Sequence, residues 1–157
     1  MVNEMIRDFL REELTPKLTL LRADTPAQFG LMTAQHMVEH ITHTVKVTVK
    51  RYGEPPTEGP VPGEGFKRFI ANGAQFKHFP SDKTSADLPK LKYERFEEAT
   101  SQLPAAIDRF YHHFEAQPGF KCFNPMMGEL GFSELEPFHY QHIRYHFWQF
   151  GLLEQYP

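Results

Sequence analysis

The sequence has one cysteine and no long hydrophobic run, and both shortages exclude whole classes of protein. Cys122 stands alone among 157 residues, which excludes an internal disulfide and is typical of a reducing compartment. No apolar run approaches the length of about 20 residues that crosses a membrane. The first ten residues, MVNEMIRDFL, lack the cationic and apolar segments of a secretion signal. We therefore expect a cytoplasmic protein without a membrane partner.

Excess positive charge is also missing. The chain has 17 lysines and arginines against 20 acidic residues, and its formal net charge is −3. The basic residues are scattered among the acidic ones, so there is no cationic stripe of the kind that neutralises nucleic-acid phosphates. We expect no nucleic-acid partner.

Hydrophobic and aromatic residues, in contrast, are plentiful. A chain of 157 residues with 40% hydrophobic content can fill one core and is too short for two ordinary domains. We therefore predict a single domain over residues 1–157. The sequence also contains 15 phenylalanines and nine histidines, and the histidines cluster. Nothing near Cys122 in the sequence would activate its thiol, so this residue is expected to be small and buried.

Hydrophobic spacing predicts four helices. Apolar side chains recur at helical intervals over residues 3–22, 33–52, 90–117 and 133–151. Between the second and third, GEPPTEGPVPGEG at residues 53–65 is too rich in proline and glycine for a helix or a central strand, and this loop is a candidate lid or dimer contact. No alternating pattern predicts a strand. The expected fold is therefore all-α, a four-helix bundle with a long loop between helices 2 and 3.

Individual residues predict where these helices bend, begin and end. Pro16 should bend or break the first helix. Thr33 is expected to cap the second helix and Gly53 to stop it. The sequence SELE at residues 133–136 has the form of a capping box for the last helix. A short additional helix fits residues 66–71.

Two pairs of histidines are spaced one helical turn apart. HMVEH ends at His40, and HIRYH runs from His142 to His146. At 3.6 residues per turn, His139 and His146 fall within the apolar face of the last helix and His142 lies at its border. Burying several histidines without partners costs free energy, whereas a divalent cation would bind them together as neutral ligands. His142 and His146 could hold one ion, and a third imidazole from the neighbouring helix, where His40 lies nearest the apolar edge, would complete the site.

Two other interpretations of these histidines stay open. HMVEH fits the H-x-x-E-H pattern of one class of zinc proteases, in which His36 and His40 would bind the metal and Glu39 would act as the base. That hypothesis needs a third ligand and leaves His142 and His146 unexplained, so we disfavour it. In the two-helix site, Glu39 would face solvent. Alternatively, the histidines bind no metal and are hydrogen-bonded core residues.

Two segments carry a resemblance to a known family. Residues 128–153, GELGFSELEPFHYQHIRYHFWQFGLL, resemble the C-terminal signature of the DinB/YfiT-like superfamily, whose members are inferred to be metalloenzymes. In that signature two histidines one turn apart are followed by a glutamine, and three positions match it: His142, His146 and Gln149. Residues 29–41, FGLMTAQHMVEHI, look like the second-helix motif of the same superfamily, with His40 at its ligand position. The likeness is greatest to a branch classed as a domain of unknown function.

The resemblance implies a four-helix bundle, often a homodimer, in which His40, His142 and His146 bind Zn²⁺ or Ni²⁺ and leave positions open for water or substrate. Better-understood members are thiol-dependent transferases or isomerases that use a low-molecular-weight thiol. The sequence departs from the branch at Asn124-Pro125, where relatives tend to have His-Pro, and in lacking a tryptophan near the start of the last helix. Both departures affect the expected substrate environment and leave the three ligands intact.

Two classes of function follow. The first is an enzyme, a hydrolase or a thiol-dependent transferase, whose metal lowers the pKa of a bound water or thiol next to a small-molecule substrate. The second is a non-catalytic, metal-stabilised dimeric bundle that binds a small molecule or a partner, with His139 closing the metal site. His139, His36 and Gln149 are the candidates for a fourth ligand or for side chains that orient the ligands. No catalytic residue can be assigned, and the candidates for a general base are His139, His36 and Glu39.

Overall fold

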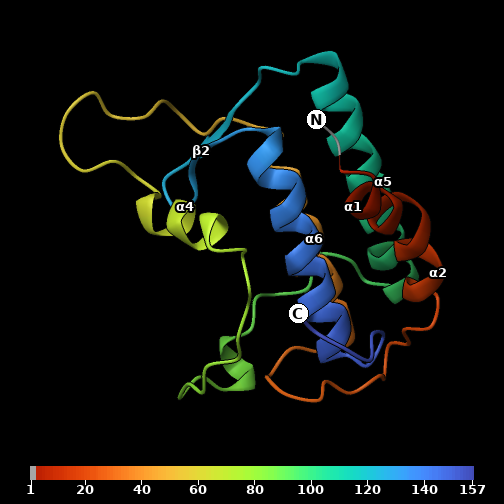
Figure 1. Ribbon diagram of the computed structural model, residues 1–157. Coiled ribbons are helices and arrows are strands. Elements are labelled where there is room, and N and C mark those ends of the chain that lie inside the picture. Colours follow the sequence, from red (N-terminus) through yellow and green to blue (C-terminus); the bar gives the residue numbers. More distant parts are fainter. Residues whose placement is uncertain (1–2) are drawn as a thin grey trace.

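The computed structural model describes residues 3–157, and the fold is mostly helical, as predicted (Figure 1). In chain order the elements are α1 (Glu4–Asp8), the π-helical turn η1 (Phe9–Glu13), α2 (Leu14–Leu18), α3 (Ala34–Val47), α4 (Glu64–Ala71), the 3₁₀ turn η2 (Ser85–Asp87), α5 (Phe96–Ala116), β1 (Cys122–Asn124), β2 (Gly128–Leu130) and α6 (Phe132–Gln149). Within this part of the chain, each helix is too short or too polar to serve as a membrane span.

The N-terminal helix passes through Pro16 without a break, because α1, η1 and α2 follow one another directly from Glu4 to Leu18. A proline inside a helix has no N–H to donate, and its ring crowds the carbonyl four residues earlier. The turn before Pro16 is widened, and the Leu14 N–H donates to the Phe9 carbonyl five residues back. The helix is thus not broken at Pro16, its backbone widens into a π-type turn instead, and it ends earlier than predicted.

Hydrogen bonds outside the helical pattern set the limits of α3. The Thr33 hydroxyl accepts a bond from the His36 backbone N–H at 3.2 Å, so the predicted cap is confirmed. The predicted end near residue 52 is wrong, because α3 stops at Val47. Beyond it the chain pairs with the strand region, where the Tyr52 N–H donates to the Phe123 carbonyl at 2.8 Å.

Helix α6 also begins differently from the prediction. Gly131 precedes its first turn, and the Glu134 carboxylate accepts the Gly131 N–H at 3.2 Å. The capping box predicted at residues 133–136 is therefore wrong, because the cap lies two residues earlier, at Gly131. Glu136 is instead buried, and it accepts a hydrogen bond from the Tyr111 hydroxyl at 2.6 Å, which joins α6 to α5.

A short antiparallel hairpin, which the sequence did not predict, precedes α6. Cys122 in β1 pairs with Leu130 in β2, and Asn124 pairs with Gly128. Strands of three residues are too short to display a clear alternating pattern, which explains the missed prediction. Cys122 is fully buried, as expected, and burial raises the pKa of its thiol.

The predicted apolar faces of the long helices form the core. Helix α3 packs against α5 and α6, and the N-terminal helix packs against the same two elements (Figure 1). The buried residues of α3 are Ala34, Met37, Val38, Ile41, Thr42 and Val45, and Thr48, directly after the helix, is buried as well. The buried face of α6 includes Leu135, His139, His142, Ile143, His146 and Phe147. Three histidines are therefore directed into the helical core, as their spacing predicted.

The long connection between α3 and α5 lies on more than one side of these helices. Residues 53–63 project to one side, at the left of Figure 1, where they run into α4. Gly63, at the end of this stretch, packs against the backbone of Met127 and Gly128 in the hairpin region. Helix α4 begins two residues before the predicted start at Phe66.

Candidate metal centre

Three histidine rings from two helices meet at one point. His40 extends from α3, and His142 and His146 extend from α6. One ring nitrogen from each lies within 4.8 Å of the other two. The Nε2 atoms of His40 and His142 are 3.0 Å apart. The structure therefore brings together the three side chains that the sequence predicted as metal ligands.

The distance between two of these nitrogens suits a shared ion. Zinc binds imidazole nitrogen at about 2.0–2.1 Å, which places two nitrogens of a tetrahedral site about 3.3–3.4 Å apart. The 3.0 Å between His40 and His142 is close to that separation. His142 and His146 are buried, whereas His40 is exposed and has more freedom to adjust.

Gln149 sets the orientation of the His146 ring. Its Nε2 group donates to the Phe29 carbonyl at 2.9 Å, so its Oε1 atom is the one that faces His146 at 2.7 Å. Because Oε1 only accepts, the Nδ1 atom of His146 carries the proton. The lone pair of His146 is then on Nε2. Metal-binding histidines usually show this arrangement, in which the other ring nitrogen donates its N–H to a hydrogen-bond acceptor.

Gly30 makes room for this glutamine. A Cβ atom at residue 30 would lie 2.8 Å from the Gln149 Nε2 atom, closer than real Cβ contacts allow. The backbone of Gly30 also has φ of +83°, in the left-handed region that favours glycine. The sequence prediction included Gln149 but not Gly30, whose only signal was its place in the motif that starts at Phe29.

The three rings are held neutral, as metal ligands must be. Burial lowers the pKa of His146 to about 4. Burial, with the neighbouring His146, His40 and His139, lowers the pKa of His142 well below its usual value. Desolvation and the nearby His43 lower the pKa of His40 as well. Near neutral pH, all three rings therefore offer lone pairs without first having to lose a proton.

Aromatic side chains surround the two buried histidines of this group. The Phe138 ring stacks on His142, with 5.5 Å between centroids and an angle of 13°. The ring centroids of Phe76 and His142 are 5.0 Å apart, and those of Tyr145 and His146 are 5.1 Å apart. These contacts fix the imidazole planes. Phe76 belongs to the irregular connection after α4, so helical periodicity could not place it at the site.

His139 lies apart from the three rings, although it is buried on the same helix. The hydroxyl of Thr48 donates to the Val45 carbonyl at 2.7 Å, so its oxygen accepts from His139 Nε2 at 2.9 Å. The other nitrogen, Nδ1, is buried and has no hydrogen-bond partner within residues 3–157. Burial lowers the pKa of His139 to about 3. The structure does not bring this candidate fourth ligand to the other three.

His36 also lies apart from them. Its Nδ1 atom is 2.7 Å from the Thr33 hydroxyl, and its Nε2 atom is 3.0 Å from the Pro89 carbonyl oxygen. Both ring nitrogens are therefore engaged with the helix cap and with the connection that leads to α5. The geometry required for His36 and His40 to bind one metal in a protease-like site is not present.

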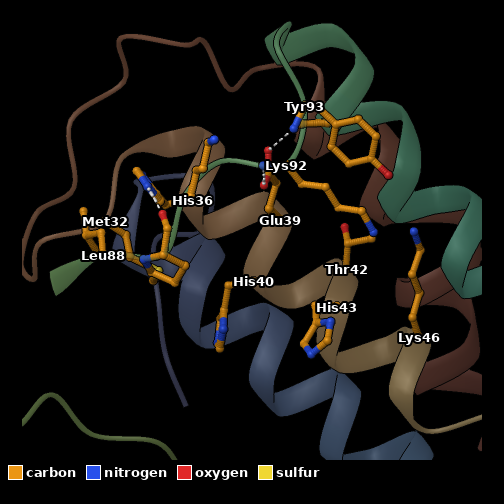
Figure 2. A pocket seen from close by; sticks show the side chains of 13 residues that line it. Met32, His36, Glu39, His40, Thr42, His43, Lys46, Leu88, Lys92 and Tyr93 are labelled. Carbon is orange, nitrogen blue, oxygen red and sulfur yellow. Dashed lines mark hydrogen bonds between the residues drawn. The ribbon is translucent and has the colours of Figure 1, made fainter. Parts of the chain in front are cut away.

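Glu39 holds the same connection on the outer face of α3. Its carboxylate accepts hydrogen bonds from the Lys92 N–H at 2.6 Å, from the Tyr93 N–H at 3.3 Å and from the Gln35 side chain at 2.9 Å. The expectation that Glu39 faces solvent is wrong. This residue anchors residues 92–93 to the helix, and Figure 2 shows it among the side chains there.

A cavity of about 460 Å³ opens on this side of α3 (Figure 2). His40 lines it together with Glu39 and with residues of the connection that Glu39 holds. The volume falls within the range of small-molecule sites, about 300–1,000 Å³. The exposed histidine of the three-histidine group is thus also part of the wall of a cavity.

No protein-family model, curated protein or solved structure matches the chain. The arrangement of the side chains themselves is what indicates the function.

Proposed function

We propose that the protein is a metal-dependent enzyme in which His40, His142 and His146 bind Zn²⁺ or Ni²⁺. The observation that carries the proposal is the meeting of three neutral imidazoles, one nitrogen of each lying within 4.8 Å of the others. Catalytic zinc is commonly held by three protein ligands, with water or substrate in a fourth position. Three ligands from two packed helices match that arrangement.

The surroundings of the three rings support an open position for substrate. Among residues 3–157, no further histidine, cysteine or carboxylate belongs to the group. His139, the candidate that would close the site in a non-catalytic bundle, bonds to Thr48 instead. His40 is exposed and lines the cavity, so a small molecule can approach from solvent.

The chemistry proposed is hydrolysis or transfer to a low-molecular-weight thiol, with a small molecule as the substrate. A divalent ion held by three neutral ligands keeps its full charge, and when bound it would lower the pKa of a water or thiol beside it. The chain's own contribution is to fix the ligand rings through Gln149 and the aromatic residues and to keep the imidazoles unprotonated.

The fold proposed is a DinB/YfiT-like four-helix bundle, assembled as a cytoplasmic homodimer. Its four helices would be the continuous N-terminal helix, α3, α5 and α6. The order of these elements and the position of the histidines on the second and last of them support this assignment.

Metal content tests the proposal. Untagged protein, purified without metal resin, is analysed by elemental mass spectrometry beside His40→Ala, His142→Ala and His36→Ala. We expect about one Zn or Ni per chain in wild type and in His36→Ala, and almost none in the other two variants. The metal-loaded protein is then screened with ester, amide and thiol-transfer substrates. Wild type that takes up neither ion after incubation with Zn²⁺ and Ni²⁺ would overturn the proposal.

A further inference from the structure

A second group of polar side chains lies in the same cavity, on the flank of α3 that faces away from the three histidines. Thr42 and Lys46 extend from α3, and Lys92 extends from the connection before α5. Figure 2 shows the two amino groups and the Thr42 hydroxyl directed toward one part of the cavity. Side chains from separate elements thus converge at a place that the metal centre does not use.

The hydroxyl of Thr42 is the first sign of a ligand there. Thr42 is 3% exposed, and its Oγ1 atom has no hydrogen-bond partner within residues 3–157. A threonine hydroxyl inside a helix usually bonds back to the carbonyl four residues earlier, as Thr44 does to His40 at 3.0 Å. Leaving a buried hydroxyl unpaired costs free energy, so the empty bond indicates a group that binds from outside.

The charges near this hydroxyl favour an anion. Neither Lys46 nor Lys92 forms a salt bridge with a carboxylate anywhere in the described part of the chain. The single carboxylate lining the cavity belongs to Glu39, and three hydrogen bonds already occupy it. Because one of those bonds comes from the Lys92 N–H, the backbone that carries the second lysine is fixed in place.

Part of the cavity wall is apolar or aromatic. Leu88, Pro89 and Ala99 line the cavity, and the Lys92 amino group lies 5.9 Å from the centre of the Tyr93 ring. A wall of this kind accepts the hydrocarbon part of a small molecule, while a few convergent polar groups fix its orientation. The ligand would therefore combine a negative end with an apolar body.

We propose that Thr42, Lys46 and Lys92 form a binding site for the oxyanion, a phosphate or a carboxylate, of a small molecule with an apolar body. The lysine amino groups neutralise the oxyanion, and the Thr42 hydroxyl donates a hydrogen bond to it. The site does not require a metal ion, since none of its three side chains belongs to the histidine group.

Isothermal titration calorimetry with phenyl phosphate, benzoate and the neutral benzyl alcohol tests the site in the full chain. We expect both anions to bind and the alcohol not to bind, with affinity falling as salt is added. The tighter of the two anions identifies the oxyanion. The titration is repeated in His142→Ala, where an unchanged affinity is expected, so a failed metal proposal would leave this result standing.

Variants locate the binding. Lys46→Met and Lys92→Met should each weaken phenyl phosphate about tenfold or more, because a charge-assisted bond is lost. Thr42→Val, which keeps the shape of the side chain, should weaken it about fivefold and raise the unfolding temperature, since the unpaired hydroxyl is gone. The exposed Lys50→Met is the matched control and should bind as wild type does. Equal affinity in wild type and both lysine variants, or no binding of either anion at millimolar concentration, would overturn the proposal.

Discussion

His139 and His146 lie on the same buried face of α6, and burial lowers the pKa of both, yet their rings are held in opposite ways. Thr48 engages Nε2 of His139, which leaves Nδ1 as the free nitrogen. Gln149 engages Nδ1 of His146, which leaves Nε2 directed toward the group with His40 and His142. Burial alone therefore does not bring a histidine into the three-ring group. The partner that holds one nitrogen decides whether and where the other can bind.

The comparison is tested most strongly by removing one histidine from each environment. His142→Ala should lose at least about a hundredfold in Zn²⁺ affinity, because one of three ligands is gone, whereas His139→Ala should bind Zn²⁺ as wild type does. Competition with a chromophoric chelator measures both affinities, and circular dichroism checks that each variant is folded. Equal losses in the two variants would mean that His139 belongs to the site after all.

Disturbing the orientation of the His146 ring should cause the next largest loss of Zn²⁺ affinity. Gln149→Leu removes the acceptor for the Nδ1 proton, and we expect Zn²⁺ affinity to fall about 10- to 100-fold, as it does when hydrogen-bond partners of ligands are lost. Gly30→Ala should act in the same direction, because its added Cβ would collide with Gln149. Gln155→Leu, at an exposed glutamine, is the matched control. Unchanged affinity in Gln149→Leu would show that packing alone orients the ring.

The smallest expected effect is a gradual fall of stability with pH. The pKa of His146 in the folded protein is about 4 and that of His139 about 3, against 6.5 for the ordinary side chain. Between these values the unfolded chain binds more protons, so the stability that neutral burial provides is complete above pH 6.5 and is lost as the pH falls toward 4. Each histidine adds a slope of up to about 1.4 kcal/mol per pH unit.

Urea unfolding of chelator-treated protein across this range measures the slope. Saturating Zn²⁺ should make the fall steeper, because protons then also displace the ion from His40, His142 and His146. His139→Leu should reduce the slope by the same amount with and without Zn²⁺, since His139 does not bind the ion. Stability that stays constant from pH 6.5 down to about pH 5 would contradict the assignment of these rings as neutral.

Periodicity made the two long histidine helices predictable. A face of α6 that contains Leu135, Ile143 and Phe147 also contains the buried histidines, and the same reasoning placed His40 at the edge of the α3 core. The spacing could not supply the tautomers of His139 and His146, because these depend on hydrogen bonds of Thr48 and Gln149 that exist only in the folded chain.

The remaining features come from contacts that are distant in sequence or too short to form a pattern. The capping-box residue Glu136 matched a helix-start motif, but burial beside Tyr111 gave it a different role. Phe76 reaches His142 from an irregular segment. Glu39 looked like a solvent-exposed helix residue, and only the folded connection shows that it binds the backbone of Lys92.

X-ray absorption at the Zn edge of the Zn²⁺-loaded protein tests the central claim most directly, because it reports the atoms bound to the ion. The account predicts three imidazole nitrogens at about 2.0–2.1 Å and one further oxygen from water. It also predicts that the spectrum of His139→Ala is the same as that of wild type. A shell of four imidazoles, reduced to three in His139→Ala, would contradict the open three-histidine site and would favour a closed, structural ion.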